Sequence, residues 1–203
     1  IFTSGADVIT LGNHSLRRPE IADFLDENEF IIRPCNYHSS APGNGSVILD
    51  KGKNRVAIIN LQGAVYLDNI INPFDSIDDE IKKVKDDGAN IIIIDFHAEA
   101  TGEKKGMGFY LDGKVSAVFG THTHTQTADE QILPNGTGYI TDIGMTGPYY
   151  SVLGVTPEVA IQKMKTNLPV RFTNPDGPCT LEGIMIEIDE ATGKTTHIER
   201  FRK

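Results

Sequence analysis

Four of the six histidines in this chain lie directly after predicted strands, where they could bind metal ions. His14 follows the apolar segment 6–11, His97 follows the segment 90–96, and His122 and His124 follow the segment 115–119. In layered α/β proteins, ligands gather outside the carboxyl ends of the strands. The sequence therefore predicts that histidines far apart along the chain converge at one edge of a sheet.

The spacing of His122 and His124 is informative in its own right. Alternate side chains of an extended backbone point the same way, so both imidazoles could reach one metal ion or two adjacent ions. Imidazole is a common ligand of borderline metals. The alternative interpretation is a chance pair of histidines in a polar loop, because short motifs recur by accident.

The neighbours of His97 and His14 leave two interpretations open. Asp95 and Glu99 flank His97 and could orient metal ligands from behind, or they could be ordinary loop charges. His97 itself could cap the end of the sheet by hydrogen bonding instead of binding a metal. Gly12-Asn13, directly before His14, is also a common turn dipeptide.

Other polar groups are predicted to have lesser roles. Backbone amides of Gly144–Gly147 could wrap a phosphate, although a tight loop near the site is the favoured interpretation. Asp142 is a candidate to support the ligands from behind and not a ligand itself. Arg171 could face a phosphate, although an ion pair on the surface is the favoured interpretation. His38 and His197 belong to no constellation and are predicted to lie on the surface.

Composition narrows the class of protein. The chain has 203 residues, enough for one domain over residues 1–203, and its 39% hydrophobic and 23% charged fractions are globular in character. A net charge of −9 argues against binding nucleic-acid polymers but leaves small phosphate esters open, if metal ions supply local positive charge.

The sequence also predicts a cytoplasmic protein without a membrane partner. No apolar run approaches the ~18 residues that a membrane span needs, and no signal peptide is recognisable. Cys35 and Cys179 lie outside any CxxC pattern, so we expect two free thiols in a reducing compartment.

Apolar periodicity predicts alternating strands and helices. Strands are expected at residues 6–11, 30–32, 46–49, 56–61, 90–96, 115–119 and 138–142, and a hairpin at residues 181–188 and 195–201. Helices are expected from about Pro19, at residues 76–85 and at residues 156–165, and residues 1–4 read as the end of a helix stopped by Gly5. This order indicates an α/β architecture with two sheets packed face to face and helices outside.

The order of the motifs resembles that of the calcineurin-like metallophosphoesterases. It runs from Gly12-Asn13-His14 through His97 to Gly120-Thr121-His122-Thr123-His124. The longer strings at residues 60–63, 95–101, 141–148 and 165–172 are more specifically similar to the YmdB-like cyclic-nucleotide phosphodiesterases. The resemblance covers nearly the whole chain and implies the layered α-β-β-α sandwich of that superfamily.

The resemblance implies a binuclear metal centre with Fe, Mn or Zn. Carried over to this sequence, Asn13, His97 and His122 would hold one divalent ion, and His124 would help to hold the other. His14 matches the histidine that contacts the scissile phosphate and protonates the leaving oxygen, while a hydroxide that bridges the two ions attacks.

The implied activity is hydrolysis of small phosphodiesters, with 2′,3′-cyclic (or 3′,5′-cyclic) nucleotides as substrates. One alternative is a phosphomonoesterase or nucleotidase on the same fold. Another is a catalytically idle scaffold that binds a nucleotide or a protein partner for regulation. The sequence does not determine the oligomeric state, but the family often forms dimers or larger symmetric assemblies, so the resemblance leaves a homo-oligomer open.

The sequence departs from the family pattern at its beginning. Family members carry a strand ending in Gly-Asp and a second ending in Gly-Glu-Asn, which supply an aspartate ligand and the bridging glutamate. Neither motif occurs here, so the chain is expected to lack the first strand–helix units. If these residues were the whole molecule, the remaining neutral ligands would predict weak metal binding. The apolar sheet edges exposed by the missing strands would predict poor stability.

Overall fold

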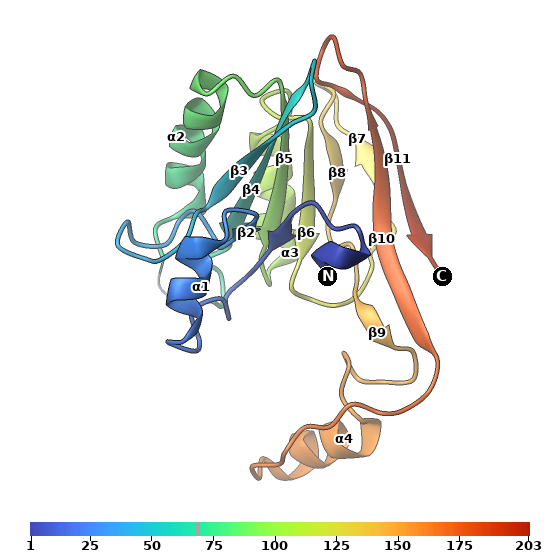
Figure 1. Ribbon diagram of the computed structural model, residues 1–203. Helices are drawn as coiled ribbons and strands as arrows, with labels where there is room; N and C mark the ends of the chain where they lie inside the picture. The colour runs from blue at the N-terminus through green and yellow to red at the C-terminus, as the bar shows by residue number, and fades with distance from the viewer. Residues whose placement is uncertain (68–69) are drawn as a thin grey trace.

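A mixed six-stranded sheet forms the centre of the protein, whose computed structural model describes residues 1–67 and 70–203 (Figure 1). The order across the sheet is β3-β4-β5-β6-β8-β7. The strands are β3 (Ser46–Asp50), β4 (Arg55–Gln62), β5 (Ile91–His97), β6 (Ala117–Thr121), β8 (Gly138–Ile140) and β7 (Gln131–Ile132). The four inner strands are parallel, and the two edge strands are antiparallel to their neighbours.

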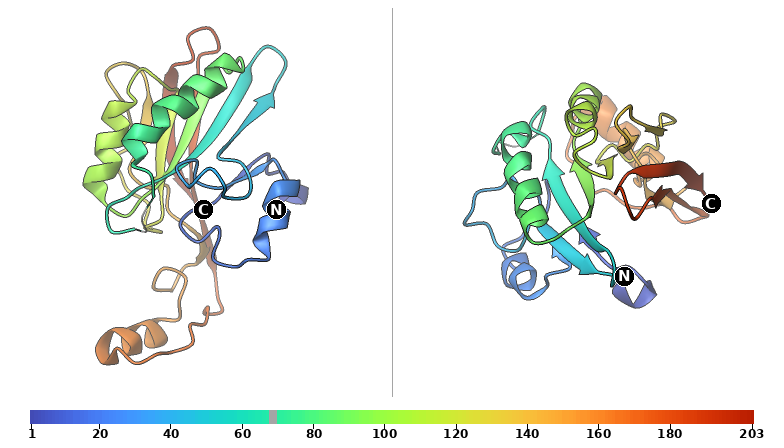
Figure 2. Two further views of the ribbon diagram at one scale, coloured as in Figure 1. Left: turned by 90° about the vertical axis from the view of Figure 1, so that its left-hand side faces the viewer. Right: turned by 90° about the horizontal axis from the view of Figure 1, so that it is seen from above.

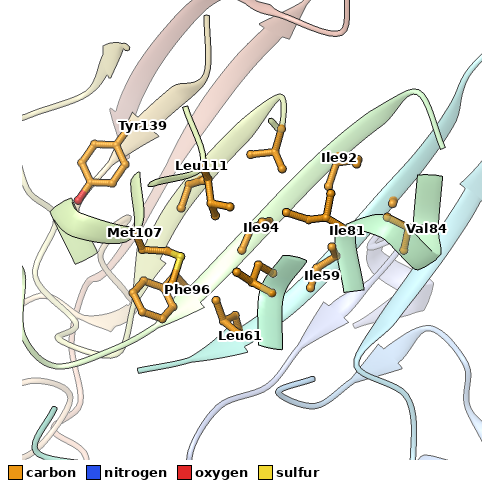
Figure 3. Packing of buried hydrophobic residues seen from close by; sticks show 14 of the residues in the cluster. Ile59, Leu61, Ile81, Val84, Ile92, Ile94, Phe96, Met107, Leu111 and Tyr139 are labelled. Atoms are coloured by element: carbon orange, nitrogen blue, oxygen red, sulfur yellow. The ribbon is translucent and has the colours of Figure 1, made fainter. Parts of the chain in front are cut away.

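Helices α2 (Pro73–Asp86) and α3 (Thr101–Tyr110) contribute side chains to the main apolar core together with the inner strands (Figure 3). The core contains Ile77, Ile81 and Val84 from α2, Met107 from α3, and Ile59, Leu61, Ile92, Ile94 and Phe96 from β4 and β5. Each such side chain stabilises the fold by roughly 1.5–3 kcal/mol when fully buried. The core therefore fixes the carboxyl ends of β4, β5 and β6, where the candidate site lies.

The N-terminal segment forms a small parallel sheet beside the main one. Its strands are β1 (Ile9–Thr10) and β2 (Ile31–Ile32), and α1 (Ile21–Glu27) lies between them in sequence. A short 3-10 helix at Phe2–Ser4 ends at Gly5, whose φ of 100° is left-handed, as predicted for a stopped helix. β1 leads directly into the Gly12-Asn13-His14 turn.

A long hairpin covers the β7–β8 side of the main sheet. It consists of β10 (Cys179–Ile188) and β11 (Thr195–Arg202), and the short strand β9 (Thr146–Pro148) pairs with β10. The Thr195 hydroxyl donates to the Ser116 carbonyl over 2.7 Å, and Gln126 Nε2 donates to the Gly183 carbonyl over 3.0 Å. These bonds fix the hairpin to the segments around β6.

An arm of residues 149–178 projects away from the sheets and carries α4 (Pro157–Thr166) (Figures 1 and 2). Tyr150, Met164 and Phe172 are exposed on it, at 72%, 70% and 57%. Ala160 is the one buried residue recorded for α4. The arm therefore displays apolar side chains that the described part of the chain does not cover.

Most predicted elements are confirmed, and three expectations need correction. The predicted strand at residues 6–11 is only two residues long, at β1. α3 was not expected, because its three glycines lower the helix propensity of the segment. The glycine-rich segment 144–147 is not simply a loop, since Thr146–Pro148 pairs with β10.

Two further expectations concern cysteines and membranes. Cys35 and Cys179 are both free thiols, as expected. None of the helices within residues 1–67 and 70–203 is long and apolar enough to cross a lipid bilayer.

Candidate metal centre and active site

Three side-chain atoms that could bind a metal ion through a lone pair lie close together at the carboxyl ends of β1, β5 and β6. His97 Nε2 lies 3.0 Å from Asn13 Oδ1 and 3.1 Å from His122 Nδ1. The imidazole rings of His97 and His122 meet edge to face, with centroids 4.8 Å apart. The fold thus brings together residues that are 84 positions apart in the sequence.

Parallel strand register explains this meeting. β5 and β6 are neighbours, and their last residues, His97 and Thr121, pair with each other. His122 directly follows Thr121 and therefore lies beside His97. Gly12 lets the Asn13 turn approach, because a Cβ at that position would lie 2.3 Å from His97 Cε1. Any larger residue at position 12 would therefore displace the His97 ring.

The backbone around His122 and His124 is not extended. Their φ angles are 95° and 61°, both left-handed, so the expectation of two side chains projecting alike from an extended segment is wrong. His124 is exposed, and within the described residues no hydrogen bond joins it to the other three donors. The structure brings Asn13, His97 and His122 together and leaves His124 at the rim.

A chain of hydrogen bonds sets the proton position on His97. The Thr121 hydroxyl donates to Asp95 Oδ1 over 2.7 Å, so its oxygen accepts from His97 Nδ1 over 3.0 Å. His97 Nε2 is then left without a proton. Asp95 is 2% exposed, and burial raises its pKa to about 6, so it is mainly an ionised acceptor at neutral pH.

His122 is oriented by a carboxylate in a similar way. Its Nε2 lies 3.0 Å from Glu99 Oε2. Burial lowers the pKa of His122, and burial followed by the neighbouring His122 ring lowers the pKa of His97 to about 3. Both imidazoles are therefore neutral at physiological pH. With Nε2–H donating to Glu99, His122 Nδ1 also presents a lone pair.

This arrangement fits a divalent cation. In the tautomers assigned above, Asn13 Oδ1, His97 Nε2 and His122 Nδ1 are all hydrogen-bond acceptors. His97 Nε2 lies 3.0 Å from Asn13 Oδ1 and 3.1 Å from His122 Nδ1, and neither pair has a proton between its atoms. Lone pairs facing one another repel, whereas a borderline cation accepts neutral nitrogen and oxygen donors. Within the described chain, no three His, Cys, Asp or Glu side chains form a metal site. A cation held by His97 and His122 would therefore need Asn13 Oδ1 as a third ligand atom.

A buried ion pair holds the backbone on both sides of His122. Lys104 Nζ lies 2.7 Å from Asp142 Oδ2, and the two side chains are 1% and 0% exposed. Lys104 also donates to the Thr121 carbonyl over 2.6 Å. Asp142 accepts from the amide and hydroxyl of Thr123 over 3.1 and 2.8 Å. Lys104 was not predicted, because in the sequence Lys104-Lys105 reads as an ordinary surface pair.

His14 is exposed and borders a cavity of about 600 Å³ on the β1 side of the cluster. Arg17, Tyr37 and His38 also line this cavity. His38 is exposed, as expected from the sequence, but it was not expected to share a cavity wall with His14. No sequence spacing links the two segments, because only the fold places residues 37–41 beside the His14 turn.

A second cavity of about 430 Å³ lies on the other side and is lined by His97, His122, His124 and residues 144–148. The Gly144 amide donates to Asp142 Oδ1 over 3.0 Å, and the Met145 amide donates to Glu182 Oε2 over 3.1 Å. These two amides are therefore already engaged, which disfavours a phosphate cradle in the glycine-rich segment.

The remaining sequence candidates lie away from the cluster. His197 Nε2 is 3.6 Å from Glu199 on the exposed hairpin, and Arg171 is exposed on the arm. Both positions agree with the surface locations expected from the sequence.

A layered α/β sheet with histidine and amide donors at its carboxyl edge is the architecture of the metallophosphoesterases. The chain belongs to the YmdB-like protein family, whose family model matches residues 1–201. It is 49% identical over 201 residues to a Bacillus subtilis protein named 2′,3′-cyclic-nucleotide 2′-phosphodiesterase. That match covers 99% of this chain and 76% of the relative.

Two solved structures share the whole fold. A hypothetical protein from Thermus thermophilus matches with a TM-score of 0.92 and 33% identity, over 100% of this chain and 78% of that one. A structure titled as a novel phosphatase, from Mycoplasma pneumoniae, matches with a TM-score of 0.90 and 33% identity, over 100% of this chain and 73% of that one.

Replacing Gly12 with alanine should weaken metal binding. The new methyl group would overlap the His97 ring and separate Asn13 Oδ1 from His97 Nε2, so we expect Zn²⁺ affinity to fall about 10–100-fold, as for other disturbed ligand supports. Isothermal titration with Zn²⁺ measures this change. Gly102→Ala is the matched control, because a Cβ there meets nothing within 4 Å. Equal affinities for both variants would contradict the proposed donor set.

Replacing Lys104 with methionine should destabilise the fold by ~3–5 kcal/mol, because Asp142 would be left buried and unpaired. Urea unfolding followed by circular dichroism measures the loss. The double variant Lys104→Met with Asp142→Leu should recover much of it, since no charge remains buried. Lys82→Met removes an exposed ion pair and should cost at most ~1 kcal/mol. If Lys82→Met and Lys104→Met lowered the free energy of unfolding by similar amounts, the buried ion pair would not be critical for stability.

Proposed function

We propose that this chain is a metal-dependent phosphodiesterase that hydrolyses small phosphodiesters, with 2′,3′-cyclic nucleotides as the main substrate class and 3′,5′-cyclic nucleotides as the second. The observation that carries the proposal is the position of His97 Nε2, which lies 3.0 Å from Asn13 Oδ1 and 3.1 Å from His122 Nδ1. The activity named for the Bacillus subtilis relative, at 49% identity, supports the substrate class.

The metal ligands in this proposal are Asn13, His97 and His122 for one divalent ion, with His124 as a ligand of a second. A divalent cation bound here supplies a Lewis acid that withdraws charge from the phosphoryl oxygens. Neutral imidazole and amide donors are compatible with Fe, Mn or Zn. Asp95 and Glu99 orient the two imidazoles, and Asp142 fixes the backbone between His122 and His124.

His14 is the proposed general acid. It is exposed beside Asn13, and its charge contributes to the low pKa of His97, so it lies close to the cluster without being part of it. An imidazole in this position can donate a proton to the oxygen that leaves phosphorus. The Arg17 guanidinium, in the same turn, can donate charge-assisted hydrogen bonds to the phosphoryl oxygens.

Two alternatives keep specific support. A phosphomonoesterase on the same fold would use the same donors, and the Mycoplasma pneumoniae relative is titled a phosphatase. A catalytically idle scaffold is supported by the neutral set of ligand atoms, because the three atoms Asn13 Oδ1, His97 Nε2 and His122 Nδ1 include no carboxylate oxygen. Activity assays on diester and monoester substrates separate these alternatives.

The test is hydrolysis of 2′,3′-cyclic AMP and bis-p-nitrophenyl phosphate with added Mn²⁺. Because the family resemblance calls for two further carboxylates, the chain is assayed beside a version preceded by a family-type N-terminal segment. We expect turnover that a chelator abolishes and that His97→Ala or His122→Ala removes. His14→Ala should lower kcat for 2′,3′-cyclic AMP by ~10²–10⁴-fold, but affect the nitrophenyl ester less because nitrophenolate leaves unprotonated.

Faster turnover of p-nitrophenyl phosphate than of either diester would favour the monoesterase. If the chain alone and the extended version were both folded and metal-loaded but inactive, the result would favour the catalytically idle scaffold. His197→Ala is the matched control, because His197 lies on the exposed hairpin and should leave all rates unchanged.

A cytoplasmic location and a homo-oligomer are also proposals. The two free cysteines are compatible with a reducing compartment. The exposed Tyr150, Met164 and Phe172 of the arm would be covered in a homo-oligomer. Light scattering should then give a mass above 22.2 kDa, whereas a monomer at all concentrations would contradict this.

A further inference from the structure

The cavity beside His14 has the size and chemistry of a small-molecule site. Its volume of about 600 Å³ falls in the ~300–1,000 Å³ range of ligand pockets. Leu16, Ala41 and Ile70 give it apolar walls, and Arg17 and His38 give it hydrogen-bond donors. None of its described lining residues is a carboxylate, and Arg17 gives this wall a positive charge.

Buried hydrogen bonds fix the floor of this cavity. The Tyr37 hydroxyl lies 2.9 Å from Gln62 Oε1 and 3.3 Å from the Gly12 carbonyl, which ties the His14 turn to the end of β4. Asn36, fully buried, donates to the carbonyls of Gln62 and Ile71 over 2.8 and 2.9 Å. The segment that carries Tyr37 and His38 is therefore preformed.

His38 has a defined donor atom. The Ser40 amide donates to His38 Nδ1 over 3.2 Å, so Nδ1 accepts and the ring proton of the neutral form is on Nε2. Within residues 1–67 and 70–203 no hydrogen bond occupies Nε2–H, which can donate to a carbonyl, a ring nitrogen or a hydroxyl of a ligand. A donor beside apolar walls suits a flat heterocycle attached to a sugar.

The chemistry of a cyclic phosphodiester decides which cavity receives the nucleoside. Hydrolysis adds water across one P–O bond: the water oxygen bonds to phosphorus, the ribose oxygen departs, and that oxygen takes a proton. In a cyclic diester the departing oxygen stays attached to the nucleoside. If His14 donates this proton, the ribose must lie on the His14 side of the cluster.

The cavity on the opposite side fits the nucleoside less well. It is lined by His97, His122 and His124 but not by His14. Its Gly144 and Met145 amides are already bonded to Asp142 and Glu182. A nucleoside bound there would place its leaving oxygen away from His14.

We propose that the cavity formed by Leu16, Arg17, His38, Ala41 and Ile70 binds the nucleoside part of the substrate. The heterocycle contacts Leu16, Ala41 and Ile70, and His38 Nε2–H donates to it or to its sugar. These residues set the preference for nucleotide diesters over diesters without a base. The choice of a nucleoside as the ligand rests on the proposed function, but the position of the site is testable without catalysis.

The experiment maps binding of adenosine 3′-monophosphate to the metal-free chain by methyl NMR. We expect saturable shifts at Leu16, Ala41 and Ile70 and none at Leu153, which lines the opposite cavities. Inorganic phosphate alone should not reproduce these shifts. Ala41→Trp fills the cavity and should raise the dissociation constant at least about tenfold, whereas Leu153→Trp, its matched control, should change it less than about twofold.

Leu16→Ala provides a second variant in case the tryptophan disturbs folding, which circular dichroism would detect. It should also weaken binding about tenfold, because apolar contact with the heterocycle is lost. Shifts at Leu153 or Met145, the absence of saturable shifts, or unchanged affinity in both variants would overturn the proposal. If adenosine 3′-monophosphate bound at Leu16, Ala41 and Ile70 but the protein showed no turnover, the proposed function would be contradicted while the nucleoside site would be supported.

Discussion

The buried ion pair between Lys104 and Asp142 is the interaction on which the candidate site depends. Burying both charges costs several kcal/mol per ion, and attraction at 2.7 Å offsets that cost only with further hydrogen bonds. Those bonds exist: Lys104 donates to the Thr121 carbonyl, and Asp142 accepts from Thr123 and from the Gly144 amide. The pair connects α3 with the ends of β6 and β8. It therefore anchors the backbone on both sides of His122 to the buried ion pair.

This attachment explains how strained residues persist next to the donors. A left-handed backbone costs a non-glycine residue of order 1–3 kcal/mol and survives where the surroundings impose it. His122 and His124 both have such φ angles, and the residues on either side of His122 are bonded to the ion pair. On this backbone, His122 Nδ1 lies 3.1 Å from His97 Nε2, so the fold itself holds the two imidazoles together. A site organised in this way requires little rearrangement on binding, which is how rigid sites act in catalysis.

Local patterns in the sequence predicted most strands and helices, whereas contacts between residues far apart along the chain could not be predicted. The apolar run at Ile91–Ile94 identified β5 as a central strand, because only a strand covered on both faces has such a run. α3 escaped prediction because its glycines weaken the helical signal, although packing of Met107 and Leu111 overrides that weakness. The histidines at strand ends were found from spacing and resemblance, and the structure gathers Asn13, His97 and His122. Lys104 and His38 carry no signal in the sequence, because their roles depend on partners far along the chain.

The close approach of the strand ends also requires two glycines, and this requirement links the sheet to the chemistry. A Cβ at Gly120 would lie 1.8 Å from the Thr141 carbonyl, and one at Gly12 would overlap the His97 ring. Both positions therefore need a residue without a side chain for β6 to lie against β8 and for the Asn13 turn to lie against β5. If the gap at Gly12 widened by the width of a methyl group, the 3.0 Å contact between Asn13 and His97 would be lost. The spacing of Asn13 and His97 is thus set by the packing of the sheet edge as well as by the two side chains themselves.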